Sequence, residues 1–307
     1  MSARVAVIGA SGTIGGAVCA GLLERGAGVL AISRGESQEN ARSRARLLAS
    51  GAELRDIADL TDVDALTTLL RGADALVVAM RASPRIIPAT EPAILAAALR
   101  AGVGRFVPDD FGTHSMATPY GVSAHFDEKK RFHEALDASG MAWTVIYPGG
   151  IAEYFLPNLR PPATVYAWGD PTLRLPIHTM HDIGAITARA VLDPRTAGHA
   201  VQLYANLLST DELIATLESH WPGSPYRLDV RTGEQLEYLR VNGEADPGDA
   251  RLSEREIMGI SYANYVLGLL GAPDHPGTLD AGTLYPDHVF EDPRELLADR
   301  EFVFGQR

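Results

Sequence analysis

The sequence has one cysteine and no excess of positive charge, and each shortage excludes a class of protein. Cys19 is the only cysteine among 307 residues, so the chain can form no internal disulfide. The formal net charge of -12 argues against nucleic acid or an anionic membrane as partner. No apolar run approaches the roughly 18 residues of a membrane span. The first expected strand starts too early for a signal peptide to precede it. We therefore expect a cytoplasmic protein.

The first fifteen residues predict a site for a dinucleotide. Residues 5–8 form a short apolar run, typical of a strand buried in a parallel sheet, and a helix is expected over about 13–24. Glycines between the two let the backbone approach a diphosphate, which the free amides and the dipole of the helix terminus attract. The predicted ligand contacts are Gly9, Ser11, Gly12, Thr13, Ile14 and Gly15.

The residue after the second expected strand, residues 28–33, indicates which dinucleotide is bound. A carboxylate there favours NAD, whereas an arginine pairs with the 2′-phosphate of NADP. Arg34 occupies this position, so we expect NADP(H) as cofactor. Three more arginines follow on the next expected helix, Arg42, Arg44 and Arg46. They could add positive potential at this site, but we interpret them as a solvated helix face.

Strands and helices alternate through the first half of the chain. Four more buried strands are expected over residues 54–57, 75–80, 105–107 and 143–146. This rhythm predicts an α/β fold with a doubly wound parallel sheet, the Rossmann fold. We assign residues 1–152 to this NADP-binding domain and residues 153–307 mainly to a smaller substrate-binding lobe. Residues 181–205, approximately, are expected to return to the Rossmann sheet.

Further cofactor contacts are expected where strands end, because ligands of such sheets bind at the carboxyl ends of the strands. Ala79 and Met80 end the fourth strand, and Phe111 lies in the loop after the fifth. Pro148 and Gly149 follow the sixth strand, where a nicotinamide ring would lie.

Lysine occurs only at positions 129 and 130, whereas every other cationic side chain is arginine. A lysine can give and take a proton when burial lowers its pKa, and an arginine cannot. Lys129 is the catalytic candidate because His125 lies one helical turn before it, on the same side of the expected helix. Lys130 is interpreted as a solvated lysine, and His133 as structural or exposed.

Aromatic side chains and prolines are frequent in residues 151–180, which we interpret as irregular structure lining a mainly apolar pocket. Packing of a core explains the aromatic residues about as well. The predicted substrate contacts are Met116, Tyr154, Phe155 and Trp168. The sequence contains no metal-ligand spacing, so no metal site is expected.

Several segments together resemble the isoflavone reductase-like family, which belongs to the NmrA-like atypical short-chain dehydrogenases. The likeness is carried by the glycine turn, Arg34, residues 105–112 (RFVPDDFG) and Phe126-x-x-Lys129. The turn at residues 193–196 and the tail at residues 284–287 also match. The family includes phenylcoumaran benzylic ether and pinoresinol-lariciresinol reductases. The resemblance implies NADPH as hydride donor, a catalytic lysine at Lys129 and a role in secondary metabolism.

The chain departs from the family pattern at three places, and one is Pro148-Gly149, which resembles the wider superfamily more than the plant reductases. Asp109 and Asp110 stand where the family usually has Ser-Glu. His125 stands four residues before Lys129, where the wider short-chain dehydrogenases have a catalytic tyrosine. The phenolic substrates of the family therefore do not transfer directly to this chain.

Three hypotheses follow from these observations. The first is an NADPH-dependent reductase of a small aromatic or conjugated molecule, acting on a C=C, C=O or C=N bond or a benzylic ether. Lys129 would orient the nicotinamide ribose and act as general acid or base, and His125 would be a second proton-transfer group. The second is an NADP-sensing regulatory protein, against which Lys129 argues. The third, a nucleotide-sugar epimerase or dehydratase, lacks its Tyr-x-x-x-Lys. The sequence leaves open whether the chain forms a homodimer.

Overall fold

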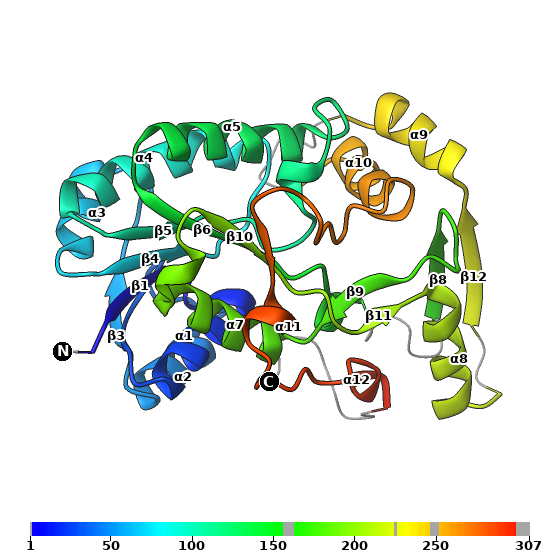
Figure 1. Ribbon diagram of the computed structural model, residues 1–307, viewed down its shortest axis with the longest axis horizontal. Helices are drawn as coiled ribbons and strands as arrows, with labels where there is room; N and C mark the ends of the chain where they lie inside the picture. Colours follow the sequence, from blue (N-terminus) through cyan, green and yellow to red (C-terminus); the bar gives the residue numbers. More distant parts are fainter. Residues whose placement is uncertain (1, 156–162, 224–225, 246–251, 299–307) are drawn as a thin grey trace. The chain divides into compact units, whose positions relative to one another are not determined.

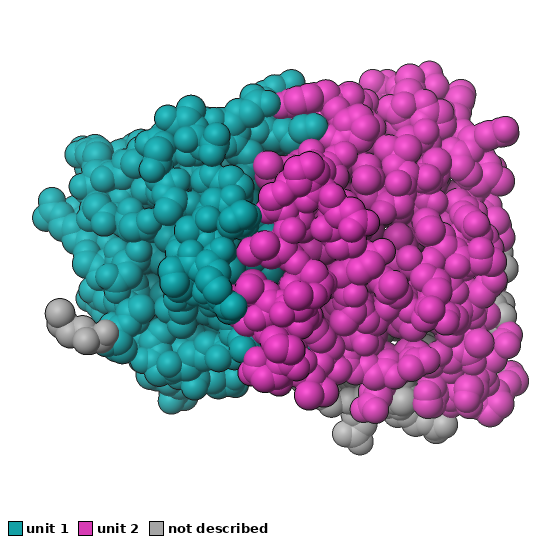
Figure 2. All heavy atoms as spheres, viewed as in Figure 1, with its two compact units in different colours: residues 1–111, 128–146, 181–201 teal, residues 112–127, 147–180, 202–307 magenta. Residues whose placement is uncertain are grey.

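The computed structural model describes residues 2–155, 163–223, 226–245 and 252–298. The chain divides into two units, which Figure 2 shows in different colours. The first unit consists of residues 1–111, 128–146 and 181–201, and the second of residues 112–127, 147–180 and 202–307. Each unit therefore combines segments that are far apart in the sequence.

The first unit is built on a twisted sheet whose central strands are parallel. Its strands are β1 (Arg4–Ile8), β2 (Gly28–Ser33), β3 (Glu53–Asp56), β4 (Ala75–Val78), β5 (Arg105–Val107), β6 (Ala142–Tyr147) and β10 (His199–Gln202). They lie in the order β10-β6-β5-β4-β1-β2-β3. β1 pairs in parallel with β2 on one side and with β4 on the other. The order reverses between β1 and β4, which confirms the doubly wound α/β fold.

Helices cover both faces of this sheet. They are α1 (Thr13–Glu24), α2 (Ala41–Ala49), α3 (Val63–Leu70), α4 (Ile86–Ala101), α5 (Ala124–Ala138) and α7 (Met180–Leu192). Figure 1 shows α1, α2 and α7 on one face, and α3, α4 and α5 on the other. A Cβ on Gly21 of α1 would lie 2.7 Å from the carbonyl oxygen of Gly184 on α7. Glycine at both positions thus lets α7 pack closely against α1.

The core between the sheet and α3, α4 and α5 is made of aliphatic and aromatic side chains. Leu66, Leu70 and Ile94 are fully buried there, together with Phe106 of β5 and Leu136 of α5. Burying each such side chain contributes about 1.5–3 kcal/mol. The core thereby holds the ends of β4 and β5, which carry residues of the candidate site, at fixed positions.

The second unit contains two small sheets and several short helices. One sheet has the order β11-β9-β7 and the other pairs β12 with β8 in parallel. The strands of these two sheets are β7 (Gly150–Ile151), β8 (Ala163–Trp168), β9 (Leu175–His178), β11 (Leu207–Leu208) and β12 (Tyr226–Arg231). The unit also contains β13 (Thr278–Asp280), which belongs to neither of them. Its helices are α6 (Ala152–Phe155), α8 (Thr210–His220), α9 (Gly233–Asn242), α10 (Glu254–Tyr265), α11 (Ala281–Leu284) and α12 (Arg294–Ala298).

The expectation of irregular structure over residues 151–180 is wrong. The segment contains α6, β8 and β9, and β8 pairs with a strand about sixty residues further along the chain. Such long-range pairing leaves no periodic signal in a segment that is interrupted by prolines. In the part of the chain that the structure describes, no helix has the length and apolar character needed to cross a membrane.

Candidate active site

The glycine turn after β1 is folded by close backbone approaches. Gly9 has φ +83°, and a Cβ there would lie 2.1 Å from the carbonyl oxygen of Ala79, at the end of β4. A Cβ on Gly15 would lie 2.2 Å from the carbonyl oxygen of Gly9. The Gly12 amide donates to that same oxygen at 2.9 Å. Only glycine fits at positions 9 and 15, because any side chain would collide with backbone.

The N-terminus of α1 is suited to hold an anion. Gly12 is the N-cap residue, no side chain caps this end, and the first turn has no acidic residue. By contrast, Asp62 caps α3 with an oxygen 2.9 Å from the amide of Ala65. Gly12 and Thr13 are exposed, whereas Ser11 and Ile14 are half-buried. Uncapped amides at an exposed helix start fit the diphosphate of a dinucleotide.

Arg34 and Arg44 have different surroundings at the end of β2. Arg34 is exposed directly after the strand. Nη1 of Arg44 lies 2.8 Å from Oγ of Ser33 and 2.6 Å from Oδ1 of Asp56, and the Arg44 side chain is only 12% exposed. The interpretation of Arg44 as part of a solvated helix face is therefore wrong, because its guanidinium ties α2 to the ends of β2 and β3. An exposed arginine at position 34 fits a 2′-phosphate.

The ends of β1 and β4 lie side by side at the point where the strand order reverses. The amide of Ala79 donates to the carbonyl of Ile8 at 2.9 Å. Ala79 is buried and Met80 half-buried. Ligands of doubly wound sheets bind beside such a reversal. Ala79 and Met80 thus flank the glycine turn, as a cofactor contact requires.

Five ionisable side chains are buried together behind these strand ends. Glu91 comes from α4, Asp109 and Asp110 follow β5, and Lys129 and His133 come from α5. Each is less than 9% exposed. Nζ of Lys129 lies 2.9 Å from Oδ1 of Asp110, and Nε2 of His133 lies 3.0 Å from Oδ2 of the same carboxylate. Because an ionised carboxylate only accepts hydrogen bonds, the Nε2–H of His133 donates to it. Asp110 therefore orients the Lys129 ammonium and the His133 ring, which both come from α5.

The pKa values of this group follow from burial and from mutual attraction. Burial by itself lowers the pKa of Lys129, but attraction by Asp110 and Asp109 outweighs burial and raises it above 10.5. A lowered pKa, the property for which a lysine was favoured over an arginine at this position, is therefore not found, and Lys129 is an ammonium at neutral pH. Burial, together with repulsion by Asp110, raises the pKa of Asp109 to about 7. Burial and repulsion by Asp109 raise the pKa of Glu91 well above its usual range.

His125 and Phe111 are the remaining predicted contacts near this segment. His125 is buried, and its ring centroid lies 5.5 Å from that of Phe126. Phe111 is half-buried. His125 belongs to the second unit and Lys129 to the first, although both lie on α5. A proton-transfer role for His125 stays a prediction. His133, interpreted as structural or exposed, is buried and structural.

In the second unit, the Pro148–Gly149 turn is held by a histidine. Nδ1 of His178 lies 2.7 Å from the carbonyl oxygen of Pro148, and its Nε2 accepts from the amide of Ala205 at 3.2 Å. Nδ1 must therefore carry the proton. Burial lowers the pKa of His178 to about 4, so the ring stays neutral. Gly149 has φ +74°, and a Cβ there would lie 2.6 Å from the carbonyl oxygen of Pro176. The turn is thus rigidly specified.

The predicted substrate contacts all belong to the second unit. Met116 is half-buried, and Tyr154 is 42% exposed. The Trp168 ring packs 6.4 Å from the ring of Tyr265 and beneath the guanidinium of Arg231, at 5.5 Å. These contacts account for Trp168 by packing. The side chain of Phe155 lies outside the described residues.

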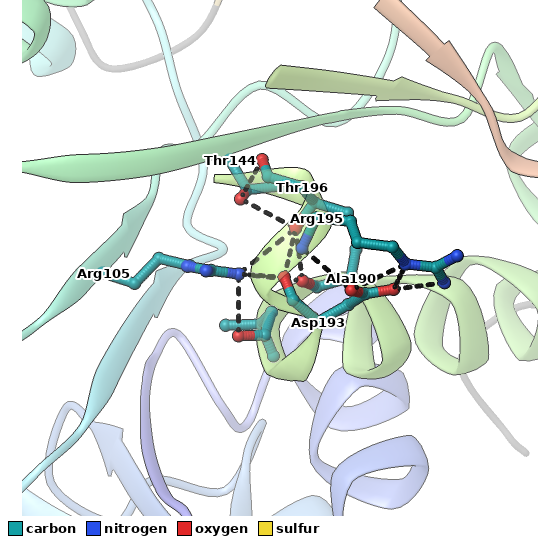
Figure 3. A network of polar contacts seen from close by, with 7 residues as sticks. Arg105, Thr144, Ala190, Asp193, Arg195 and Thr196 are labelled. Carbon is teal, nitrogen blue, oxygen red and sulfur yellow. Dashed lines mark hydrogen bonds and ion pairs between the residues drawn. The ribbon is translucent and has the colours of Figure 1, made fainter. Parts of the chain in front are cut away.

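Two family-like segments meet at the opposite end of the first unit's strands. Nη1 of Arg105, at the start of β5, lies 2.6 Å from the carbonyl oxygen of Asp193 and 3.2 Å from Oγ1 of Thr196 (Figure 3). The same atom lies within 3.3 Å of the carbonyl oxygens of Ala190 and Val191. Arg105 thereby satisfies carbonyls at the C-terminus of α7. This part of the resemblance reflects folding and not catalysis.

The sequence did not indicate two features of the site. One is Glu91, and the other is the contact of Asp110 with both Lys129 and His133. Glu91 is an acid on the buried side of a largely apolar helix, which is the one signal that points to it. Among the described residues, no group of three or more metal-ligating side chains is arranged to hold a metal ion.

Comparison with known proteins identifies the family. Residues 1–246 match the NmrA-like family, and the chain belongs to it. It is 30% identical to phenylcoumaran benzylic ether reductase Pyrc5 of Pyrus communis over 227 residues, which cover 66% of this chain and 68% of the relative.

Two solved structures share the fold. The complex of leucoanthocyanidin reductase from Vitis vinifera with NADPH superposes with a TM-score of 0.83 at 22% identity, covering 96% of this chain and 98% of the other. AtPrR2 with NADP+ and (+)-pinoresinol has a TM-score of 0.78 at 25% identity, with 97% and 98% covered.

Proposed function

We propose that this chain is an NADPH-dependent reductase of a small aromatic or conjugated molecule. The observation that carries the proposal is the buried Lys129 ammonium, held by Asp110 directly behind the ends of β4 and β5. A reductase needs a proton donor at this place, and a protein that only senses NADP does not need one. Membership of the family and the likeness to benzylic ether and pinoresinol-binding relatives support the same class.

NADPH, when bound, supplies the hydride. The backbone amides at Thr13 and Ile14, in the first turn of α1, would bind its diphosphate, and Arg34 would pair with its 2′-phosphate. Lys129 would hydrogen-bond the nicotinamide ribose and donate a proton to the substrate atom that gains negative charge. Asp110 keeps Nζ oriented for both tasks. Because the pKa of Lys129 is raised, its starting state in reduction is the general acid.

The substrate class is proposed from the family and from the aromatic residues of the second unit. An activity assay identifies which bond is reduced: C=C, C=O, C=N or a benzylic ether. The test is NADPH oxidation by the purified protein with a panel of aromatic enones, ketones, imines and benzylic ethers. We expect turnover of at least one class.

Lys129→Ala should lower kcat by roughly 10²-fold or more, as loss of a general acid does, while the Kd for NADPH changes little. Lys130→Ala is the matched control, since it removes the same charge from the next position of α5, and it should keep wild-type kcat. Retained turnover in Lys129→Ala would remove this lysine from the reaction. Tight NADPH binding with no turnover of any panel member would favour the sensor.

A further inference from the structure

The buried group around Lys129 contains more carboxyl groups than one ammonium can neutralise. Asp110 binds both the Lys129 ammonium and the His133 ring. Glu91 and Asp109 are two further carboxyls, 2% and 5% exposed, within the same electrostatic group. Three ionised carboxylates and one ammonium would leave uncompensated negative charge in the interior, which is strongly unfavourable. At least one proton must therefore be retained on Glu91 or Asp109 at neutral pH.

Asp109 has the geometry of a carboxyl that exchanges this proton. Its Oδ2 is buried and has no hydrogen-bond partner among the described residues. The carboxyl also accepts a hydrogen bond from the backbone amide of Met80, which partly stabilises its ionised form. Met80 belongs to the strand end that flanks the glycine turn. Asp109 is thus linked by this hydrogen bond to the strand end beside the glycine turn, and by electrostatic attraction to Lys129.

Glu91 differs from Asp109 because it is the more strongly perturbed acid. Burial and the charges of Asp109 and Asp110 oppose its ionisation, and only Lys129 favours it. The pKa of Glu91 is therefore held well above its ordinary range. The ionisable groups around Asp109 are Glu91 from α4, Asp110 beside it, and Lys129 and His133 from α5.

We propose that Asp109 stores a proton for Lys129 and restores its ammonium after each reduction. The proposal rests on the proposed function and makes Asp109 a residue that acts through Lys129. When Lys129 protonates the substrate, an Nζ–H bond breaks and Lys129 becomes a neutral amine. The O–H bond of the Asp109 carboxyl then breaks and the Nζ–H bond re-forms. The Asp109 carboxylate takes up its next proton from solvent, so charge and protons balance.

This assignment explains why an acid stands at position 109. A third carboxyl beside an already paired lysine destabilises the folded chain unless it holds a proton. A purely structural role would be filled by Asn or Ser at lower cost.

The test compares Asp109→Asn with Asp64→Asn, a control that removes an acid whose side chain is 85% exposed on α3. Infrared spectra of the full chain with NADP+ bound are recorded from pH 5 to pH 9. The wild type should show a protonated-carboxyl band that disappears with a midpoint near pH 7, and Asp109→Asn should lack it. Lys129→Met should move the midpoint upward, because the ammonium favours ionised Asp109. A band unchanged in Asp109→Asn would overturn the proposal.

The second measurement is the pH dependence of kcat with the best panel substrate. We expect kcat of the wild type to fall as the pH rises through about 7, and Asp109→Asn to have roughly tenfold lower kcat without that step. If Asp109→Asn does not fold, Asp109→Ser replaces it. An unchanged pH profile in these variants refutes the proton-storing role even when the wild type is a reductase. Absence of turnover in the wild type refutes the proposed function instead, while the infrared result still decides the proton on Asp109.

Discussion

Replacing Lys129 by methionine should destabilise the protein in a pH-dependent manner. Methionine keeps an unbranched chain and a high helix propensity, so the change mainly removes the charge. Lys129 is 8% exposed and its Nζ lies 2.9 Å from Asp110. Removing one partner of a buried ion pair costs about 3–5 kcal/mol because the other charge stays buried and uncompensated. We expect this loss in the free energy of unfolding at pH 9.

The loss should be smaller at pH 5, and the sign follows from the pKa shifts. The pKa of Lys129 is raised above 10.5, so its own stabilising contribution is complete at both pH values and is lost only at higher pH. The ammonium lowers the pKa values of Asp109 and Glu91, so both rise further in the variant. At pH 5 these acids are protonated and need no compensation, whereas at pH 9 Asp109, with a pKa of about 7, is ionised. The difference between the two pH values should be at least about 1 kcal/mol, the equivalent of one pKa unit.

The assay is urea unfolding followed by circular dichroism at pH 5 and pH 9, without cofactor. Lys130→Met is the matched control, since it removes the same charge from the adjacent helix position, away from the Lys129–Asp110 pair. The control should change the free energy of unfolding by less than about 1 kcal/mol at either pH. Equal losses for Lys129→Met at both pH values, or equal losses for the two variants, would refute the charge-compensation argument.

Two further variants separate cofactor recognition from folding. Arg34→Ser should raise the Kd for NADPH by roughly 10- to 100-fold, the equivalent of the 1.5–3 kcal/mol of a charged hydrogen bond, and leave the Kd for NADH unchanged. Arg42→Ser on the exposed side of α2 is its control in fluorescence titrations, and an equal effect there would contradict a specific 2′-phosphate contact. Arg105→Met should lower the free energy of unfolding by about 2 kcal/mol, because carbonyls at the end of α7 lose their donor. Its Kd for NADPH should stay within twofold of wild type, and a larger rise would mean that Arg105 also shapes the cofactor site.

Much of the first unit could be predicted from the sequence because its signals are local. The apolar run before Gly9 and the glycines at its end predicted β1 and the start of α1 correctly. The helix from Thr13 to Glu24 and the strand from Gly28 to Ser33 have the predicted bounds. Lys129 was identified by its rarity and its helical position, and the structure brings it onto a buried carboxylate.

The sequence by itself therefore determined the Rossmann fold, the glycine turn and the candidate lysine, because periodicity, glycine spacing and composition act over a few residues. Tertiary structure decided which side chains surround that lysine. Glu91 and Lys129 are 38 positions apart in the sequence, and their charges act on each other only because α4 and α5 cover the same face of the sheet. Tertiary structure likewise decided which strand pairs with β8 and which carboxylate pairs with Arg44. Packing also reversed the expected direction of the Lys129 pKa, because attraction by nearby carboxylates outweighs burial, and no local pattern records that balance.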